Sequence, residues 1–387
     1  MTIPHLAAAR KNEAFTRRLS LTRQIAIALL AAATVVAPQP VLAEAPTAST
    51  MSAENQAPLE ASGYLGREVM VPMRDDIRLH AWVWRPSEQR GPLPILITRG
   101  PYGFGTDKMK AILAGQYKDL VDSGYILVFQ DIRGRFGSEG QFVMLRPRAT
   151  EPEGVDESTD AYDSVEWLIR NLPDNNGRAG MFGVSYAGWT SALATVNPHP
   201  ALKAVSVQAS PDDMFIGDDF HHNGAFRLDY AWEYTAALET DGRTLNKFSF
   251  GKDDPYGWFL KQKSLASLDR NHLGRTLPTW QNFVRHPTYD QYWKAVVTSK
   301  MMDSKVSVPN LNVVGWYDQE DFYGPLKIYA NQEKGDDKNR NFLVIGPWNH
   351  GGWNNGPGES ADSEVIAPTI PRNSRPGFRA DPAHRSD

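Results

Sequence analysis

One stretch, Gly180 to Trp189 (GMFGVSYAGW), constrains the fold more than any other part of the chain. The apolar run from Ala179 to Phe182 predicts a buried strand, and Tyr186 to Val196 predicts a helix that ends before Pro198. Ser185 then stands at a tight turn between strand and helix. Its flanking glycines leave room for that turn, and the N–H groups at the helix start can stabilise an oxyanion. Ser185 is therefore a candidate nucleophile.

The spacing around Ser185 departs from the usual elbow pattern. It is G-x-S-x-x-G, because Ala187 takes the place of the usual second glycine and Gly188 follows it. Taken alone, this pattern also fits an ordinary turn of small residues between a strand and a helix. A base and an acid elsewhere in the chain are needed to decide between the two interpretations.

The composition excludes several classes of chemistry. With 387 residues, 41% of them hydrophobic, the chain can form one large core plus an insertion or a second domain. A net charge of -4 gives no indication of nucleic-acid binding. The absence of cysteine rules out disulfides, thiolate metal sites and a thiol nucleophile.

The N-terminus has the organisation of an export signal. An arginine-containing segment precedes an apolar run from Ile25 to Ala37, and small residues follow up to Ala43. We predict a signal peptide over 1–43, so that the mature protein is periplasmic or secreted and free of the membrane. An uncleaved N-terminal anchor is the alternative, although the run is short for a membrane span. Residues 44–62 have linker composition, and 358–387 have that of a disordered tail.

Between these ends, predicted strands alternate with predicted helices. The expected strands are the hairpin 64–73 and 77–85, then 94–98, 125–129, 179–182, 204–207, 310–314 and 341–345; the expected helices are 108–122, 158–172, 186–196 and 322–332. Such alternation predicts an α/β fold, with a mostly parallel sheet and helices on both faces. Residues 212–305 have helical spacing without clear buried strands. They predict a helical cap inserted between core segments 63–211 and 306–357.

Two further candidates follow predicted strands. Asp318 comes after the strand 310–314, and His350 comes after the strand 341–345. The chain order Ser…Asp…His is that of the α/β-hydrolase fold, in which an imidazole base and its carboxylate partner activate the serine. The alternatives are a helix cap for Asp318 and a loop histidine with a satisfied hydrogen bond for His350.

Other histidines are weaker candidates for the base. His80 is expected in a hairpin strand far from the strand ends, and His199, between two prolines, in a surface loop. His221 and His222 suggest a metal, but no further ligands occur at workable spacing, so we predict neither a metal site nor a cofactor.

Several motifs together resemble a known superfamily. GxSYxG at Gly183–Gly188, GWYD at Gly315–Asp318 and GPWxH at Gly346–His350 resemble the serine hydrolases of the cocaine esterase and X-Pro dipeptidyl-peptidase superfamily. The segment Asp131–Gly140 (DIRGRFGSEG) fits the same group. More specifically, the chain resembles the α-amino-acid ester hydrolases in three segments: 153–163, 217–227 and 318–321. The resemblance extends from Tyr64 to Gly356.

The resemblance implies roles for individual residues. It makes Ser185 the nucleophile, His350 the base and Asp318 the residue that orients the base. The oxyanion hole would combine the backbone N–H of Tyr186 with the hydroxyl of Tyr102, a group that can donate to an oxyanion. A packed loop aromatic is the alternative for Tyr102.

The resemblance also implies a site for a substrate ammonium group, formed by Asp219, Glu320 and Asp321. Crowded carboxylates repel one another, and a bound cation relieves that repulsion. The alternative is that acids near a helix start simply favour the helix dipole. Asp218 is the less suitable member of its pair.

The function that these expectations support is serine-dependent hydrolysis, or acyl transfer, of small-molecule esters or amides of α-amino acids, with β-lactam side chains among the acyl groups of the family. A general esterase or dipeptidyl-peptidase is one alternative, and a truncated, inactive remnant is another. Members of the family usually carry a C-terminal jelly-roll domain, and we expect none in this sequence, because the resemblance stops near Gly356. The homo-oligomeric assembly of the family is also only an expectation here.

Overall fold

The computed structural model describes residues 59–151, 153–302 and 304–355. The predicted signal peptide and the predicted tail lie outside the described residues. All described residues fall in one of the two units into which the chain divides, residues 48–387. In the described part of the chain no helix is both long and apolar enough to span a bilayer.

A nine-stranded sheet with the order β1-β2-β3-β5-β4-β6-β7-β10-β11 forms the centre of the fold. Its strands are β1 (Leu59–Ala61), β2 (Tyr64–Pro72), β3 (Arg78–Pro86), β4 (Leu93–Gly100), β5 (Ile126–Asp131), β6 (Asn175–Val184), β7 (Leu202–Gln208), β10 (Asn310–Gly315) and β11 (Asn341–Gly346). The first four strands of this order, β1, β2, β3 and β5, pair antiparallel, and every pairing from β5 to β11 is parallel. The predicted hairpin and the mostly parallel sheet are confirmed.

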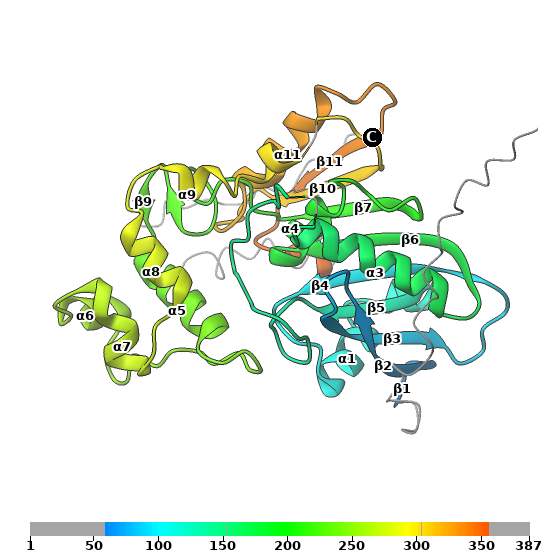
Figure 1. Cartoon of the computed structure of the whole chain (residues 1–387), viewed down its shortest axis with the longest axis horizontal. Helices are drawn as coiled ribbons and strands as arrows, with labels where there is room; N and C mark the ends of the chain where they lie inside the picture. Colours follow the sequence, from blue (N-terminus) through cyan, green and yellow to red (C-terminus); the bar gives the residue numbers. More distant parts are fainter. Residues whose placement is uncertain (1–58, 152, 303, 356–387) are drawn as a thin grey trace, which may run out of the picture. The chain divides into compact units, whose positions relative to one another are not determined.

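Helices cover both faces of this sheet, as predicted (Figure 1). The core helices are α1 (Thr106–Ala114), α2 (Lys118–Asp122), α3 (Glu157–Asn171), α4 (Tyr186–Leu193) and α11 (Tyr323–Glu333). Alternate residues of β5 enter two separate apolar clusters. Val128 packs in the cluster that contains Leu168 of α3, and Phe129 packs in the cluster that contains Met109 of α1. This period-two burial is what a strand covered on both sides requires.

The segment between β7 and β10 is mostly helical. It contains α5 (Leu228–Glu239), α6 (Pro255–Leu260), η1 (Leu265–Ser267), α7 (Leu268–Leu273), α8 (Pro278–Arg285), α9 (Gln291–Lys294) and α10 (Thr298–Met301). Two short antiparallel strands, β8 (His221–His222) and β9 (Ala225–Phe226), were not predicted. The boundaries 212–305 for a separate cap stay a prediction.

The single helix predicted over 108–122 is wrong. The structure has two helices here, because the backbone leaves the helical region at Gly115, with φ −118° and ψ −95°. Glycine carries no Cβ and reaches such conformations at little steric cost, so the helix ends there. The spacing of apolar residues continues past Gly115, so that spacing alone could not predict the break between the two helices.

One face of the sheet near β10 and β11 is apolar and exposed. Leu311, Phe342 and Val344 are 37%, 51% and 41% exposed. Leu311 is the register partner of Phe342, so these two side chains share one face. A cavity of about 440 Å³ adjoins this face, and Phe182 and Leu311 are among the residues that line it.

Candidate active site

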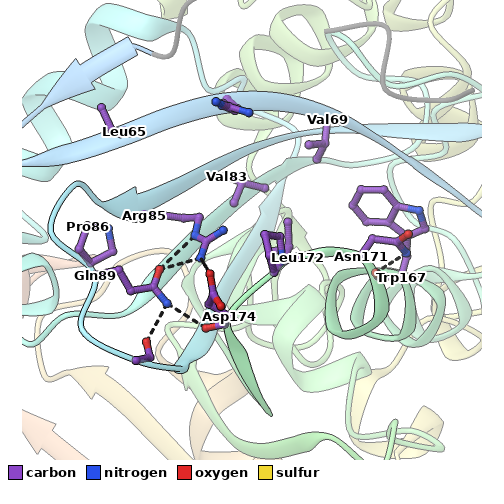
Figure 2. A pocket seen from close by; sticks show the side chains of 13 residues that line it. Leu65, Val69, Val83, Arg85, Pro86, Gln89, Trp167, Asn171, Leu172 and Asp174 are labelled. Carbon is purple, nitrogen blue, oxygen red and sulfur yellow. Dashed lines mark hydrogen bonds and ion pairs between the residues drawn. The ribbon is translucent and has the colours of Figure 1, made fainter. Parts of the chain in front are cut away.

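One clear cavity lies away from the predicted chemistry. It measures about 530 Å³ and is lined by residues of β2, β3 and the end of α3 (Figure 2). There Arg85 donates to Gln89 at 2.7 Å and approaches Asp174 at 3.5 Å. The residues that line it include no serine, histidine or tyrosine, so it offers neither a nucleophile nor a base. The candidate site must be sought at the carboxyl ends of the parallel strands.

Ser185 occupies the turn that the sequence predicts, between β6 and α4. Its φ of 63° and ψ of −130° are unusual for a residue with a side chain, as expected of a strained elbow. A Cβ on Gly183 would lie 2.5 Å from Ala187, and a Cβ on Gly188 would lie 2.4 Å from the carbonyl oxygen of Gln208. The second glycine is thus needed at 188, where α4 meets β7, and Ala187 is tolerated.

The N-terminus of α4 supplies one of the two predicted oxyanion donors. The backbone N–H of Tyr186 follows Ser185 directly and makes no hydrogen bond to any residue that the structure describes. The side chain of Tyr186 points elsewhere, and its hydroxyl donates to the carbonyl oxygen of Met144 at 2.8 Å. The free N–H is the group that an oxyanion would require.

Tyr102, the second predicted donor, lies in the loop after β4. Its hydroxyl oxygen is 2.8 Å from the hydroxyl oxygen of Tyr234. Burial is the main reason that the pKa of Tyr102 is raised, and Ser185 is among the side chains that influence its hydroxyl. The phenol therefore keeps its proton at neutral pH and can donate it in a hydrogen bond near Ser185.

Asp318 and His350 meet, as predicted. Nδ1 of His350 is 3.0 Å from each carboxylate oxygen of Asp318. The loops that carry them are joined by backbone bonds, from Tyr317 N–H to the oxygen of Trp348 at 2.9 Å and from Trp316 N–H to the oxygen of Gly346 at 2.7 Å. Burial would raise the pKa of Asp318, but the hydrogen bond and charge of His350 outweigh it, and this pKa is lowered.

Neighbouring residues link Ser185 to the loop that carries His350. Its N–H donates to the oxygen of Gln208 at 2.9 Å, and the side chain of Gln208 accepts from Nε1 of Trp353 at 2.7 Å. The loop after His350 is therefore fastened beside the elbow. No hydrogen bond links Ser185 to His350 among the described residues; instead Nε2 of His350 lies 3.6 Å from Glu320. Catalytic hydrogen bonds are often long without substrate.

Asp219 and Glu320, two of the three predicted ammonium ligands, are brought together. Their loops are joined by the bond from Asp219 N–H to the oxygen of Glu320 at 3.0 Å. The hydroxyl oxygen of Tyr230 lies 2.8 Å from Asp219 Oδ1 and 3.1 Å from Glu320 Oε2. Burial, followed by the charge of Glu320, raises the pKa of Asp219 to about 6. A tyrosine has only one hydroxyl proton, so it satisfies one of these carboxylates at a time.

Asp321, the third predicted ligand, is fully buried, and neither of its carboxylate oxygens has a hydrogen-bond partner in the described structure. Burial and the neighbouring acids, Asp219 first among them, raise its pKa well above the usual range. Within the residues described, none of the three acids forms an ion pair with lysine or arginine. Arg227 lies nearby, but its guanidinium donates to the backbone carbonyl of Asp219 at 2.7 Å and not to a carboxylate of the cluster. Buried carboxylates normally have a cationic partner, so these three acids have room for a further cation.

His350 is the cationic group that faces the cluster. Burial alone would lower its pKa, but the hydrogen bond that His350 donates to Asp318 and the charges of Asp318, Glu320 and Asp219 outweigh burial and raise it to about 9. In the absence of substrate the imidazole is therefore protonated at neutral pH. It must lose that proton before it can act as a base.

The neighbouring acid Asp218 has a structural role. It is fully buried and accepts the N–H groups of Asp212, Asp213 and Gly324 at 2.8 to 3.0 Å. These bonds tie the segment after β7 to the start of α11. Asp218 is thus occupied, in agreement with the preference for Asp219.

Two expectations about histidines are wrong. His80 is not far from the strand ends, because β3 pairs with β5 and Nδ1 of His80 lies 2.8 Å from Asp131. His199 is not on the surface; it is 8% exposed and its Nε2 lies 2.5 Å from Glu166. His221 is buried among aromatic rings. The described residues contain no group of three or more acidic or histidine side chains placed to hold a metal.

Two tyrosines of α5 contact the site and were not singled out from the sequence. Tyr230 contacts the acid pair and Tyr234 contacts Tyr102. Their rings stack with centroids 5.7 Å apart, as residues four apart on a helix can do. That spacing is visible in the sequence, but which face of the helix meets the site is not.

Known proteins resemble this chain over most of the described part. Residues 75–352 match the family described as X-Pro dipeptidyl-peptidase (S15 family). The cocaine esterase of Rhodococcus sp. (strain MB1 Bresler) is 30% identical over 318 residues, which is 78% of this chain and 51% of that enzyme. The chain thus spans about half the length of this relative.

Two solved structures are similar at 35% sequence identity. One is an aminopeptidase from the marine sediment archaeon Thaumarchaeota archaeon, with a TM-score of 0.70, which covers 78% of this chain and 51% of that one. The other is an α-amino acid ester hydrolase, with a TM-score of 0.69, which covers 79% of this chain and 52% of that one.

Proposed function

Because the chain belongs to the X-Pro dipeptidyl-peptidase (S15) family, we propose that it is a serine-dependent hydrolase of esters or amides whose acyl group carries a free α-amine. Ser185 is the nucleophile, His350 the base and Asp318 the residue that orients the base. The N–H of Tyr186 and the hydroxyl of Tyr102 form the oxyanion hole. Water completes hydrolysis, and an amine in its place gives acyl transfer.

The unpaired acids beside His350 are the observation that carries this proposal. Asp219, Glu320 and Asp321 are wholly or largely buried and have no lysine or arginine partner among the described residues. A substrate ammonium group would supply the missing charge and donate to their free oxygens. An uncharged acyl group would leave the carboxylates unpaired, so the cluster favours cationic acyl groups over neutral ones.

The similar proteins support the same choice. The two structures at 35% identity are an aminopeptidase and an α-amino acid ester hydrolase, and both names imply substrates with a free amine next to the cleaved carbonyl. The cocaine esterase, at 30% identity, supports ester hydrolysis in general. A general esterase is therefore the second candidate, and it differs from the first in having no preference for the amine.

The proposed reaction forms an acyl-enzyme. Ser185 Oγ attacks the carbonyl carbon, its proton passes to His350 Nε2, and the carbonyl oxygen becomes an oxyanion bound by Tyr186 and Tyr102. The intermediate collapses, and the leaving alcohol or amine takes the proton from His350. A water molecule then attacks the acyl-enzyme, with His350 again as base, and Ser185 regains its proton when the acid leaves.

The position of His350 suggests how an ammonium substrate assists its own cleavage. Nε2 of His350 lies 3.6 Å from Glu320, so the imidazolium is itself a counter-ion of the acid cluster. An ammonium bound to Glu320 takes over that role. The pKa of His350 then falls, the neutral imidazole becomes available, and Nε2 is free to bond to Ser185.

A pair of esters that differ only in the amine tests the proposal. We expect the protein to cleave phenylglycine methyl ester with a higher kcat/KM than methyl phenylacetate. Asp219→Asn and Glu320→Gln should each reduce this preference by about 10- to 100-fold, because a hydrogen bond to a charged group contributes about 1.5 to 3 kcal/mol. The measurement is kcat/KM for both esters with each variant.

Glu233→Gln is the matched control, since this acid of α5 makes no hydrogen bond or ion pair to the cluster among the described residues. If the Asp219 and Glu320 variants keep the wild-type preference for the α-amino ester, the proposed ammonium site is wrong and the general esterase is the better description. The remaining alternative, an inactive remnant, is decided by a fluorophosphonate probe: a folded chain whose Ser185 stays unlabelled supports it.

A further inference from the structure

The hydroxyl of Tyr102 has a neighbour that decides where its proton points. The two hydroxyl oxygens of Tyr102 and Tyr234 are 2.8 Å apart, and either could donate. A tyrosine carries one hydroxyl proton and can also accept. If Tyr102 donates to Tyr234, its proton is not available to an oxyanion. If Tyr234 donates, the Tyr102 proton is free to point toward the carbonyl that Ser185 attacks.

The surroundings of Tyr234 favour the second arrangement. Tyr102 is the only hydrogen-bond partner of the Tyr234 hydroxyl among the described residues. A buried hydroxyl group needs an acceptor for its proton, and the oxygen of Tyr102 is the acceptor at hand. The Tyr102 proton is then free for a second partner, and the side chain of Ser185 is among the groups that act on the pKa of Tyr102.

Both phenols keep their protons. Burial is the main reason that the pKa of Tyr234 is raised well above its usual value, and the nearby Tyr102 and Asp219 add to the shift. The pKa of Tyr102 is raised for the same main reason. Neither tyrosine is therefore a phenolate at neutral pH, and a phenol that accepts one hydrogen bond becomes a better donor in the next.

A buried arginine holds the two tyrosines in position. Arg135 is fully buried, and its guanidinium donates to the carbonyl of Pro101, directly before Tyr102, at 3.0 Å. The same group donates to the carbonyl of Leu238, in the last turn of α5, at 2.6 Å. It also donates to the carbonyls of Asp241 and Thr244, just after α5. The loop of Tyr102 and the helix of Tyr234 are therefore fastened by one side chain.

We propose that Tyr234 is a positioning residue for the oxyanion hole: its hydroxyl donates to Tyr102 and thereby directs the Tyr102 proton toward the oxyanion, while Arg135 fixes the distance between them. This inference rests on the proposed role of Tyr102. It gives α5, a helix of the segment between β7 and β10, a part in the chemistry of the core (Figure 1).

A double-mutant cycle tests this proposal. Tyr102→Phe should lower kcat about 100-fold, in the range seen when an oxyanion donor is removed. Tyr234→Phe should lower kcat about 10-fold and leave KM nearly unchanged, because its effect falls on the transition state. In the Tyr102→Phe background, Tyr234→Phe should change kcat less than about two-fold, since Tyr234 acts only through the Tyr102 hydroxyl.

A packing role for Tyr234 predicts another result. Tyr234→Phe would then lower kcat equally in the wild-type and Tyr102→Phe backgrounds, or it would change KM together with kcat. Either outcome overturns the proposal, and so does an unchanged kcat in the Tyr234→Phe single variant. Tyr292→Phe removes a hydroxyl from another tyrosine of the same segment, whose ring packs against His286 and which makes no hydrogen bond to Tyr102 or Tyr234 in the described structure. As the control, it should leave kcat unchanged. Thermal unfolding of each variant shows whether it is folded.

The test separates this inference from the proposed function. The cycle is run with methyl phenylacetate as well as with the α-amino ester. A wild-type protein that cleaves both esters equally contradicts the proposed substrate class, and the cycle still decides the role of Tyr234. A wild-type protein that cleaves neither ester and does not react with a fluorophosphonate overturns both.

Discussion

Two of the clusters of buried carboxylates in the described structure differ in what neutralises them. The arginine-paired cluster consists of Glu157 and Asp160 of α3 with Arg99 and Arg133. The unpaired cluster consists of Asp219, Glu320 and Asp321, beside His350. Burying a charge without a partner destabilises the fold in both places. The comparison shows which buried carboxylates have a cationic partner within the chain and which do not.

In the arginine-paired cluster each acid has a cation. Arg133 donates to Asp160 at 2.7 and 3.1 Å and also binds Asp75. Arg99 approaches Glu157 at 3.2 Å. These contacts join the ends of β4 and β5 to the first turns of α3, and all four side chains are buried. The cluster is a fixed part of the fold.

In the unpaired cluster the carboxylate groups contact Tyr230 and a histidine that must lose its proton to act, and none contacts a lysine or arginine side chain among the described residues. Burial is the main reason that the pKa values of Asp219 and Asp321 are raised, and the charges of the neighbouring acids add to the shift. A fold gains nothing from such an arrangement by itself. The difference from the first cluster supports the proposal that a substrate cation completes it, and strained sites of this kind are typical of function.

The largest effect is expected from breaking the arginine-paired cluster. Arg133→Met leaves Asp160 buried without its main partner, so we expect the free energy of unfolding to fall by about 3 to 5 kcal/mol. Denaturant unfolding measures this directly. Arg74→Met is the matched control, because Arg74 pairs with Asp163 at a partly exposed position and its loss should change stability by no more than about 1 kcal/mol. Equal decreases in the free energy of unfolding for Arg133→Met and Arg74→Met would show that the buried ion pairs contribute no more to stability than the partly exposed one.

The unpaired cluster should instead control the pH dependence of catalysis. The pKa of His350 stands at about 9, because Asp318, Glu320 and Asp219 outweigh the opposing effect of burial. The base must be neutral, so kcat/KM for an ester without an amine should rise with pH up to that value. Glu320→Gln removes one nearby negative charge, lowers this pKa and should move the rising limb to lower pH by about one unit. A limb that stays in place, or moves to higher pH, would show that Glu320 does not act on His350.

Much of this arrangement could be predicted from sequence, for a physical reason. Ser185, Asp318 and His350 each follow an apolar strand, and parallel strands end at the same edge of a sheet, so their proximity follows from local pattern and chain order. The glycine at 188 was predicted to differ from the usual pattern, and the contact between α4 and β7 explains it.

The predictions that failed depend on long-range contacts. His199 is buried because Glu166, far away in the chain, meets it, and His80 lies at a strand end because β3 is the neighbour of β5. Tyr234 was overlooked because it comes from the segment between β7 and β10, whose helices carry no indication of which face meets the core. Local periodicity predicts the elements, and it does not specify which distant side chains complete a site.

The smallest expected effect is an increase in stability, whereas breaking the arginine-paired cluster is expected to decrease it. Asp321→Asn removes a fully buried charge whose oxygens have no partner in the described structure, so we expect the free energy of unfolding at pH 7 to rise by about 1 kcal/mol. The folded-state pKa of Asp321 is raised, so ionisation opposes folding above the unfolded-state value, and the gain should disappear as the pH is lowered to about 4. Asp160→Asn, in the arginine-paired cluster, should destabilise instead. If both substitutions destabilise the protein to the same extent, Asp321 has a structural role and the cluster does not serve to bind a substrate cation. If Asp321→Asn stabilises the fold and also weakens the preference for the α-amino ester, then Asp321 lowers stability in order to bind the substrate.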